Sequence, residues 1–260
     1  MPENGKLTRR QVNLMAGAAV AAGPYIQKMR AAGDQVAFGV VGTGSRGQYL
    51  LERLNHLGTG RCVALCDNYE PHLSKAAQLT VGGPGRHTDY RHLLEQKDVA
   101  AVVIATPLHT HFPIARDALL AGKHVFCEPP LVFRPQEVHA LRELAAAQSA
   151  QTLQVGLERR YSQFYQTARQ MASKGMLGEV TDIQAQWHRN PGWTMDPNQP
   201  RERNWRLFRE YSGGLTAEFA SHQIDVASWV FADSPEFVVG VGISLRGELT
   251  ELYVSQWIRN

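Results

Sequence analysis

A strand-turn-helix pattern with three glycines is the feature that most restricts how this chain can fold. The stretch Val36–Val41 is mainly apolar and partly β-branched, and Gly42-Thr-Gly-Ser-Arg-Gly47 follows it directly. From Gln48 the apolar residues recur at helical spacing. In this context the first glycine permits a tight turn, the second lets a ligand approach the backbone, and the third allows close helix packing. The pattern predicts a phosphate-binding turn at the start of a helix.

A second apolar strand ends in an acidic residue at the spacing expected for a dinucleotide site. Asp67 follows Cys62-Val-Ala-Leu-Cys66, about twenty residues after the last glycine, where an acid binds the hydroxyls of the adenosine ribose. A carboxylate there repels a 2′-phosphate, and no arginine follows it directly. We therefore expect NAD as the cofactor, with NADP possible. The alternative is a glycine-rich turn beside a surface aspartate.

Strand and helix patterns alternate as far as residue 155. Apolar strands are predicted at 99–105, 124–127 and 152–155, with helices at 113–121 and 135–148 between them. This alternation predicts an α/β fold with a doubly wound parallel sheet. Polar residues follow two of these strands, at the edge where open α/β sheets bind ligands.

The pattern changes after Gly156. Helices are predicted at 161–174 and 215–231, and strands at 180–187 and 235–243. These elements indicate an α+β second domain with an open, largely antiparallel sheet. The expected division is an export signal and linker at 1–34, a Rossmann domain at 35–155 and a second domain at 156–260.

Composition and charge limit which kinds of ligand and macromolecule the protein is expected to bind. The 260 residues carry a formal charge of +3, and no Lys/Arg run with interleaved aromatic residues occurs, so nucleic acid is not an expected partner. Cys62 and Cys66 would lie about 13 Å apart on one strand, beyond disulfide reach, and are expected to be small buried residues. His109 and His111 have no matching carboxylate nearby in the sequence, so no metal site is expected.

The N-terminus resembles a twin-arginine export signal. Arg9 and Arg10 precede the apolar stretch 15–23, which is too short to span a bilayer, so no stable membrane insertion is expected. A periplasmic or other extracytoplasmic location follows from this interpretation. The alternative is an irregular N-terminal helix.

The twin-arginine start and the stretch Asn204-Trp-Arg-Leu-Phe-Arg-Glu-Tyr-Ser-Gly-Gly214 resemble the exported branch of the Gfo/Idh/MocA (glucose-fructose oxidoreductase / inositol dehydrogenase) family, and four motifs in order resemble the family as a whole. They are Gly42–Gly47, Ala105-Thr-Pro-Leu-His-Thr-His111, Ala121-Gly-Lys-His-Val-Phe-Cys-Glu-Pro-Pro130 and Gly213-Gly-Leu-Thr-Ala-Glu-Phe-Ala-Ser-His-Gln-Ile-Asp225. The resemblance implies hydride transfer between a nicotinamide and a sugar or polyol. It also implies a homo-oligomer for a complete chain, and a C-terminal domain of which this chain carries only part.

The resemblance also implies the site residues. Glu218 and His222 stand where the family has an Asp/His pair, one helical turn apart, and Glu218 is expected to orient His222. Pro129 stands where the family has a lysine, so His222 is expected to be the remaining proton carrier. The expected catalytic residues are His222, Glu218 and Asp225. From their side-chain chemistry, Arg160, Trp205 and Arg206 are expected to bind the substrate through stacking and hydrogen bonds, and the alternative is that they cover the sheet. The expected cofactor-binding residues are Gly42, Gly44, Ser45, Arg46, Gly47, Asp67, Thr106, Pro107, His109, His111 and Glu128.

Two other functions fit the same residues. One is a redox-neutral enzyme that uses tightly bound NAD to process a glycoside. The other is a catalytically impaired cofactor-binding protein, because proline has no titratable group.

Overall fold

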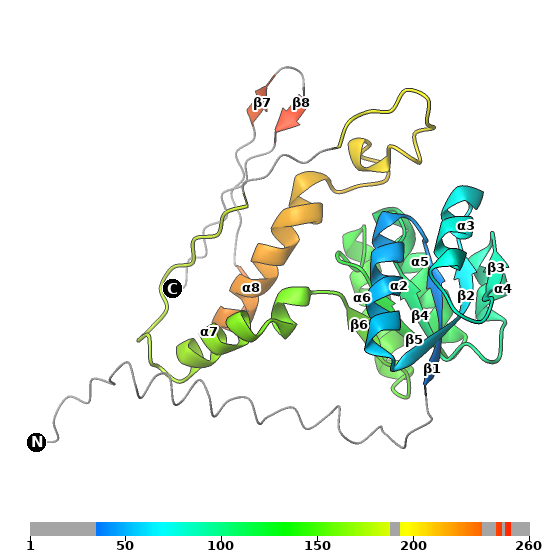
Figure 1. Ribbon diagram of the computed structural model, residues 1–260. Coiled ribbons are helices and arrows are strands. Elements are labelled where there is room, and N and C mark those ends of the chain that lie inside the picture. The colour runs from blue at the N-terminus through cyan, green and yellow to red at the C-terminus, as the bar shows by residue number, and fades with distance from the viewer. Residues whose placement is uncertain (1–34, 188–192, 236–242, 246–247, 251–260) are drawn as a thin grey trace, which may run out of the picture. The chain divides into compact units, whose positions relative to one another are not determined.

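The computed structural model describes residues 35–187, 193–235, 243–245 and 248–250 (Figure 1). The predicted export signal and most of the strand predicted at 235–243 lie outside these residues.

A six-stranded parallel sheet is the centre of the first domain (Figure 1). Its strand order is β3-β2-β1-β4-β5-β6, and every neighbouring pair is parallel. The strands are β1 (Val36–Val41), β2 (Gly60–Cys66), β3 (Gly85–His87), β4 (Ala101–Ile104), β5 (His124–Cys127) and β6 (Leu153–Val155). The predicted doubly wound parallel sheet is confirmed.

Helices cover both faces of this sheet, and their apolar residues form two cores. The helices are α2 (Ser45–Leu57), α3 (Glu70–Gln78), α4 (Tyr90–Leu94), η2 (Leu108–Thr110), α5 (His111–Leu120) and α6 (Pro135–Ala147). Leu51 of α2 and Leu73 of α3 are buried in one cluster, whereas Leu119 of α5 and Leu141 of α6 are buried in the other.

Strand β4 shows why the sequence forms a two-faced sheet. Val102 and Ile104 belong to the core beneath α5 and α6, and Val103, between them, belongs to the core beneath α2. Because successive side chains of a strand point to opposite faces, an uninterrupted apolar run is needed when both faces are covered. The same run ends at the edge of the sheet that carries the candidate site.

The three cysteines are free and buried, as expected. Burial raises the pKa of Cys62 and of Cys66 to about 12, so both remain neutral thiols near neutral pH. They contribute packing to the sheet core.

The second domain departs from the sequence prediction in two places. Residues 180–187 were expected to form a strand, but they pair with no other strand among the described residues, so this prediction is wrong. The helix predicted at 215–231 begins with a wider π-helical turn, η5 (Thr216–Ala220), before α8 (Ser221–Phe231). The other elements are η3 (Glu158–Tyr161), α7 (Gln163–Ser173), η4 (Trp205–Leu207), and the antiparallel pair β7 (Ile243–Leu245) and β8 (Glu248–Thr250).

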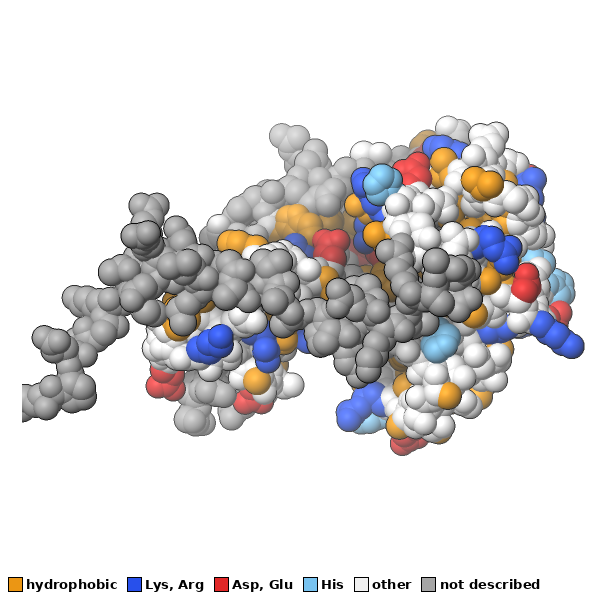
Figure 2. All heavy atoms as spheres, turned by 60° about the horizontal axis from the view of Figure 1, so that its bottom comes forward, with side chains coloured by type: hydrophobic (Ala, Val, Ile, Leu, Met, Phe, Trp, Pro, Cys, Tyr) orange, Lys and Arg blue, Asp and Glu red, His pale blue; other side chains and the backbone are white. Residues whose placement is uncertain are grey.

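On the face in view in Figure 2, basic and acidic side chains are interspersed with apolar ones. Among the described helices, none combines the length and the apolar character needed to cross a membrane.

Candidate functional site

Two glycines after β1 have backbone arrangements that a side chain would disrupt. Gly42 has a φ of 88°, and a Cβ atom added there would lie 2.6 Å from the carbonyl oxygen of Ala105. A Cβ atom added to Gly47 would lie 1.9 Å from the carbonyl oxygen of Gly42. The tight turn and the close helix packing expected at these two positions are therefore both present.

Gly44 is under no such restriction. Its backbone is extended, with a φ of −65°, and an added Cβ atom would lie 3.5 Å from the nearest heavy atom, Cε1 of His72. Helix α2 begins at Ser45, and no side-chain hydrogen bond caps its N-terminus. Because the fold itself does not require glycine at this position, the open backbone and the uncapped N–H groups fit the pyrophosphate of a dinucleotide.

Asp67 lies beside this turn at the end of β2. Its Oδ2 accepts a hydrogen bond of 2.8 Å from the N–H of Thr43, and its Oδ1 accepts one of 2.9 Å from the N–H of Tyr69. Only 9% of the side chain is exposed. Oδ2 also accepts a hydrogen bond of 3.3 Å from the hydroxyl of Thr43, so Asp67 is held in place and its Oδ1 can still accept a hydrogen bond from a ribose hydroxyl.

Arg46 joins the glycine-rich turn to the loop after β5. Its Nε and Nη2 donate to the two oxygens of Glu128 at 2.7 and 3.1 Å, and Nη2 lies 4.0 Å from Oε2 of Glu158. Burial raises the pKa of the Glu128 carboxyl, and the hydrogen bond from Arg46 opposes that shift. Two expected cofactor-binding residues are thus brought together as an ion pair.

The loop after β4 presents His109 at the same edge of the sheet. Thr106 and Pro107 lead into η2, where the hydroxyl of Thr110 donates to Oγ1 of Thr106 at 2.8 Å. Nδ1 of His109 is buried without a hydrogen-bond partner among the described residues, and its ring packs against Tyr211 with centroids 4.8 Å apart. His109 therefore retains one ring nitrogen for a ligand.

His111 has a structural role, and its expected contact with the cofactor stays a prediction. Its side chain is buried, with Nδ1 2.8 Å from the carbonyl oxygen of Pro130 and Nε2 2.9 Å from that of Thr106. Burial lowers the pKa of His111, and the carbonyl oxygens of Pro130 and Thr106, which can accept from its ring nitrogens, oppose that shift. His111 ties the loop after β4 to the loop after β5, and both of its nitrogens face backbone.

His222, on α8, lies among charged residues from both domains. Burial lowers its pKa, and the nearby Arg159 charge lowers it further, while the Glu158 carboxylate opposes the shift. Nδ1 of His222 is buried and has no hydrogen-bond partner among the described residues. The His222 ring packs against the Trp187 ring with centroids 5.7 Å apart. The guanidinium of Arg159 lies 4.7 Å from the centre of the Trp187 ring.

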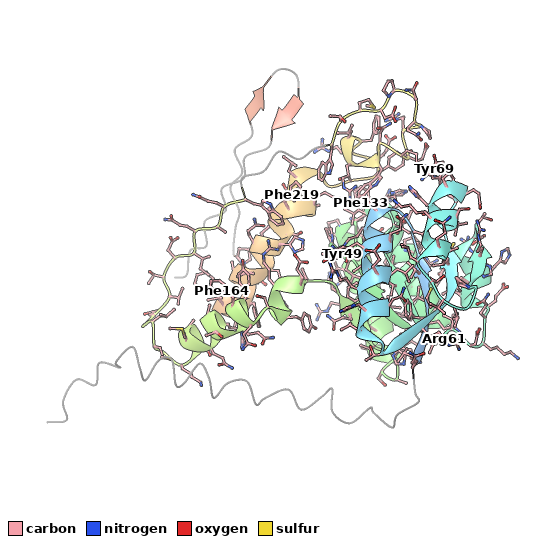
Figure 3. The ribbon with its side chains drawn as sticks, in the orientation of Figure 1. Tyr49, Arg61, Tyr69, Phe133, Phe164 and Phe219 are labelled. Carbon is pink, nitrogen blue, oxygen red and sulfur yellow. The ribbon has the colours of Figure 1, made fainter. Side chains whose placement is uncertain are left out.

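The expected contact between Glu218 and His222 is not formed, which corrects that prediction. Oε2 of Glu218 accepts a hydrogen bond of 3.1 Å from Nε of Arg206, and Oε1 accepts one of 3.3 Å from the hydroxyl of Ser212. Burial raises the pKa of Glu218, and Arg206 opposes this. Glu218 lies in the π-helical turn η5, and its two carboxylate oxygens are bonded to Arg206 and Ser212 and not to His222 (Figure 3 labels its neighbour Phe219).

Asp225 and Arg160 also form a pair, although they were expected to have separate roles. Nε and Nη2 of Arg160 donate to Asp225 at distances of 2.7 to 3.0 Å. Such a two-pronged pair fixes η3 against α8. The expected substrate residues Arg160 and Arg206 therefore pair with acidic residues expected to be catalytic, and Arg206 also lies 4.2 Å from the ring centre of Trp205.

An open hollow of about 370 Å³ lies beside η3 and is lined by Glu158, Arg159, Ser162 and Tyr165. Nη1 of Arg159, like Nδ1 of His222, is buried without a hydrogen-bond partner among the described residues. A hydroxyl group of a ligand in this hollow can accept a hydrogen bond from Arg159, which lines it.

Sequence reasoning missed three residues that the structure brings to the site. Glu158 faces Arg46 and His222, His72 lies beside Asp67, and Arg203 contacts His72. None of them belongs to a motif. The sequence shows only that charged residues are frequent just before the predicted helices. This pattern does not indicate which residue each charged side chain contacts.

Two family models match the chain in order. Residues 36–157 match a model described as an oxidoreductase family with an NAD-binding Rossmann fold, and residues 165–256 match the GFO/IDH/MocA C-terminal domain. The two matches agree with the division between the sheet domain and the elements after η3.

The chain is similar to several known proteins. It is 31% identical over 196 residues to inositol 2-dehydrogenase of Gluconacetobacter diazotrophicus, covering 75% of this chain and 54% of that one. It is 28% identical to glycosyl hydrolase family 109 protein 2 of Shewanella sp. strain ANA-3, over 70% of this chain and 42% of that one. The chain spans about half the length of the first curated relatives that it matches.

Among solved structures, scyllo-inositol dehydrogenase of Lactobacillus casei with bound NAD(H) and scyllo-inositol has the same fold. The TM-score is 0.66 at 23% identity, and the match covers 82% of this chain and 60% of that one. The glycine-rich turn, the strand order and the two domain models in sequence agree with one another, and the chain belongs to the Gfo/Idh/MocA family.

Proposed function

We propose that this protein is an NAD-dependent oxidoreductase that acts on a hydroxyl group of a sugar or polyol. The observation that carries this proposal is Nη1 of Arg159, which is buried without a hydrogen-bond partner among the described residues, in a side chain that lines the hollow next to η3 and whose charge lowers the pKa of His222. Arg46 of the glycine-rich turn also contributes to the electrostatic surroundings of His222, which links this hollow to the cofactor-binding turn.

The residues divide the chemistry between them. A bound nicotinamide supplies the acceptor for the hydride that leaves the alcohol carbon. Nδ1 of His222, neutral near pH 7, takes the hydroxyl proton, and Arg159 donates hydrogen bonds to substrate oxygens. Asp67 holds the adenosine ribose, and the N-terminus of α2 holds the phosphates.

Turnover of a panel of polyols, aldoses and glycosides with added NAD tests this proposal. Net formation of NADH with a polyol or sugar supports a dehydrogenase. Consumption of a glycoside without net NADH supports the alternative below. Binding of NAD without turnover of any panel member contradicts both enzymatic proposals and supports a cofactor-binding protein.

The alternative is a redox-neutral enzyme that processes glycosides with tightly held NAD. Two observations favour it: Pro129 replaces the lysine of the family motif, and the chain is similar to a glycosyl hydrolase family 109 protein. Transient oxidation followed by elimination and re-reduction returns the hydride to the substrate, so it needs no net hydride acceptor.

The pH dependence of oxidation is expected to report His222. His222 must be neutral to take a proton, and burial and Arg159 lower its pKa below 6.5, so kcat/KM is expected to fall only in acid. Arg159→Ala removes a lowering influence and should move this acid limb to higher pH. Glu158→Gln removes a raising influence and should move the limb to lower pH. Identical limbs in the wild type and both variants would contradict a proton-carrying role for His222.

Pro129→Lys is expected to raise dehydrogenase turnover. The residue follows Glu128, which pairs with Arg46, so a lysine here restores a positioned acid/base, a contribution worth about a hundredfold or more. Steady-state kcat with the best polyol of the panel is the measurement. Pro197→Lys, at an exposed position, is the matched control. Equal kcat values for the wild type and Pro129→Lys would show that the lysine position is not limiting.

A further inference from the structure

Arg203, in the segment 193–212 of the second domain, contacts residues that follow Asp67 at the end of β2. Its guanidinium is 3.7 Å from the ring centre of Tyr69, and Nη2 donates to Oδ1 of Asn68 at 3.3 Å. Nη1 lies 3.4 Å from Nδ1 of His72. Figure 3 shows Tyr69 at the start of α3, so the second domain contributes an arginine to the side of the Rossmann site that holds an adenosine.

His72 has conflicting hydrogen-bond partners in this cluster. Its Nδ1 is 3.4 Å from Oδ2 of Asp67, which can only accept, and 3.4 Å from Nη1 of Arg203, which can only donate. A single ring nitrogen carries either one hydrogen or one lone pair, so it cannot serve both partners. A group that both donates to Asp67 and accepts from Arg203 would relieve this conflict.

A ribose diol provides such a group. Each hydroxyl both donates and accepts, so one can donate to Asp67 while accepting from Arg203. The two hydrogen bonds of Arg203 are long, at 3.3 and 3.4 Å, and the fork has further N–H groups to offer. His72 also lies against Gly44, at 3.5 Å from an added Cβ, so the cluster adjoins the place where the pyrophosphate approaches.

We propose that Arg203 is a binding residue for the adenosine ribose of the dinucleotide, supplied by the second domain to the Rossmann site. This inference rests on the proposed binding of NAD. The nearby Asp67 carboxylate repels a 2′-phosphate, so the group recognised is the free diol. Because Arg203 also contacts the start of α3, cofactor binding holds the segment 193–212 against the first domain.

The test compares ADP with 2′-deoxy-ADP, each titrated by calorimetry into the wild-type protein and its variants. The wild type is expected to prefer ADP, because the 2′-hydroxyl accepts from Arg203. Arg203→Ala should lose about tenfold of that preference, the size expected for a hydrogen bond to a charged group. Arg203→Lys, which keeps the charge but not the fork, should lie between the two. Arg201→Ala is the matched control, because Arg201 pairs with Glu210 and Phe208 in the same segment.

The preference ratio separates a direct contact from a structural role. Loosening of the segment 193–212 would weaken the binding of both nucleotides equally and leave the ratio of their affinities unchanged. An unchanged affinity ratio in Arg203→Ala therefore overturns the inference. If the wild type binds NAD but shows no preference between the two nucleotides, the inference also fails while the proposed function stands. If the wild type binds neither NAD nor ADP, the proposed function itself fails.

Discussion

Gly44→Val is expected to lower the affinity for NAD by about a hundredfold or more, because displaced phosphates lose several charge-assisted hydrogen bonds. The fold should tolerate the change. Gly44 has an extended backbone, and an added Cβ atom meets only the edge of the His72 ring, at 3.5 Å. The valine would instead fill the space through which a pyrophosphate approaches the N-terminus of α2. Calorimetry with NAD, beside thermal unfolding without ligand, measures the two effects separately.

Two other glycines frame this experiment. Gly58→Asn, at the opposite end of α2, is the matched control: its φ of 65° is a conformation that asparagine tolerates, and no atom lies within 4 Å of an added Cβ. Gly47→Ala should unfold the domain, because its Cβ atom would lie 1.9 Å from the carbonyl oxygen of Gly42. Wild-type affinity in Gly44→Val would show that the dinucleotide does not approach this turn.

His222→Ala is expected to lower kcat for oxidation by about a hundred- to ten-thousand-fold, the usual contribution of a positioned proton carrier. Nδ1 of His222 is buried without a partner among the described residues, and burial and Arg159 keep its pKa low enough for the ring to accept a proton. With Pro129 in the lysine position, the motifs supply no second group for this step. Single-turnover kinetics with bound NAD would isolate the chemical step.

Variants of other residues test whether this loss is specific. His139→Ala changes an exposed histidine on α6 and should leave kcat unchanged. Glu218→Gln should lower thermal stability, because it weakens the buried pair with Arg206, while leaving the pH of the acid limb in place. A shift of that limb in Glu218→Gln would restore the orienting role that the sequence predicted. A kcat in His222→Ala equal to that of the wild type would remove His222 from the mechanism.

The first domain could be predicted from the sequence because its determinants are local. Apolar runs such as Val99–Ala105 predict strands whose two faces are both buried. Gly42 and Gly47 are needed because a side chain at either position would clash with backbone atoms. The connections between parallel strands are short and right-handed, so few strand orders are possible for this sequence. The position of Asp67 at a strand end follows from the same periodicity.

Predictions that needed a partner distant in the sequence were less successful. Residues 180–187 alternate like a strand, but a strand exists only when another pairs with it, and none does so among the described residues. The short strand β3 has no apolar run in the sequence, and it forms by pairing with β2. Glu218 and His222 have helical spacing, but Glu218 pairs with Arg206 and not with His222.

The sequence by itself determined where the chain needs glycine, which strands and helices have apolar faces, and which side chains can transfer protons. Each of these properties depends on a residue and its near neighbours. Only the tertiary structure decided which charges meet. Arg46 pairs with Glu128 across 82 residues, Arg160 pairs with Asp225 across 65, and Arg203 reaches His72 across 131. A charged side chain has many possible partners of opposite sign, and only the packing of the helices on the sheet selects one of them.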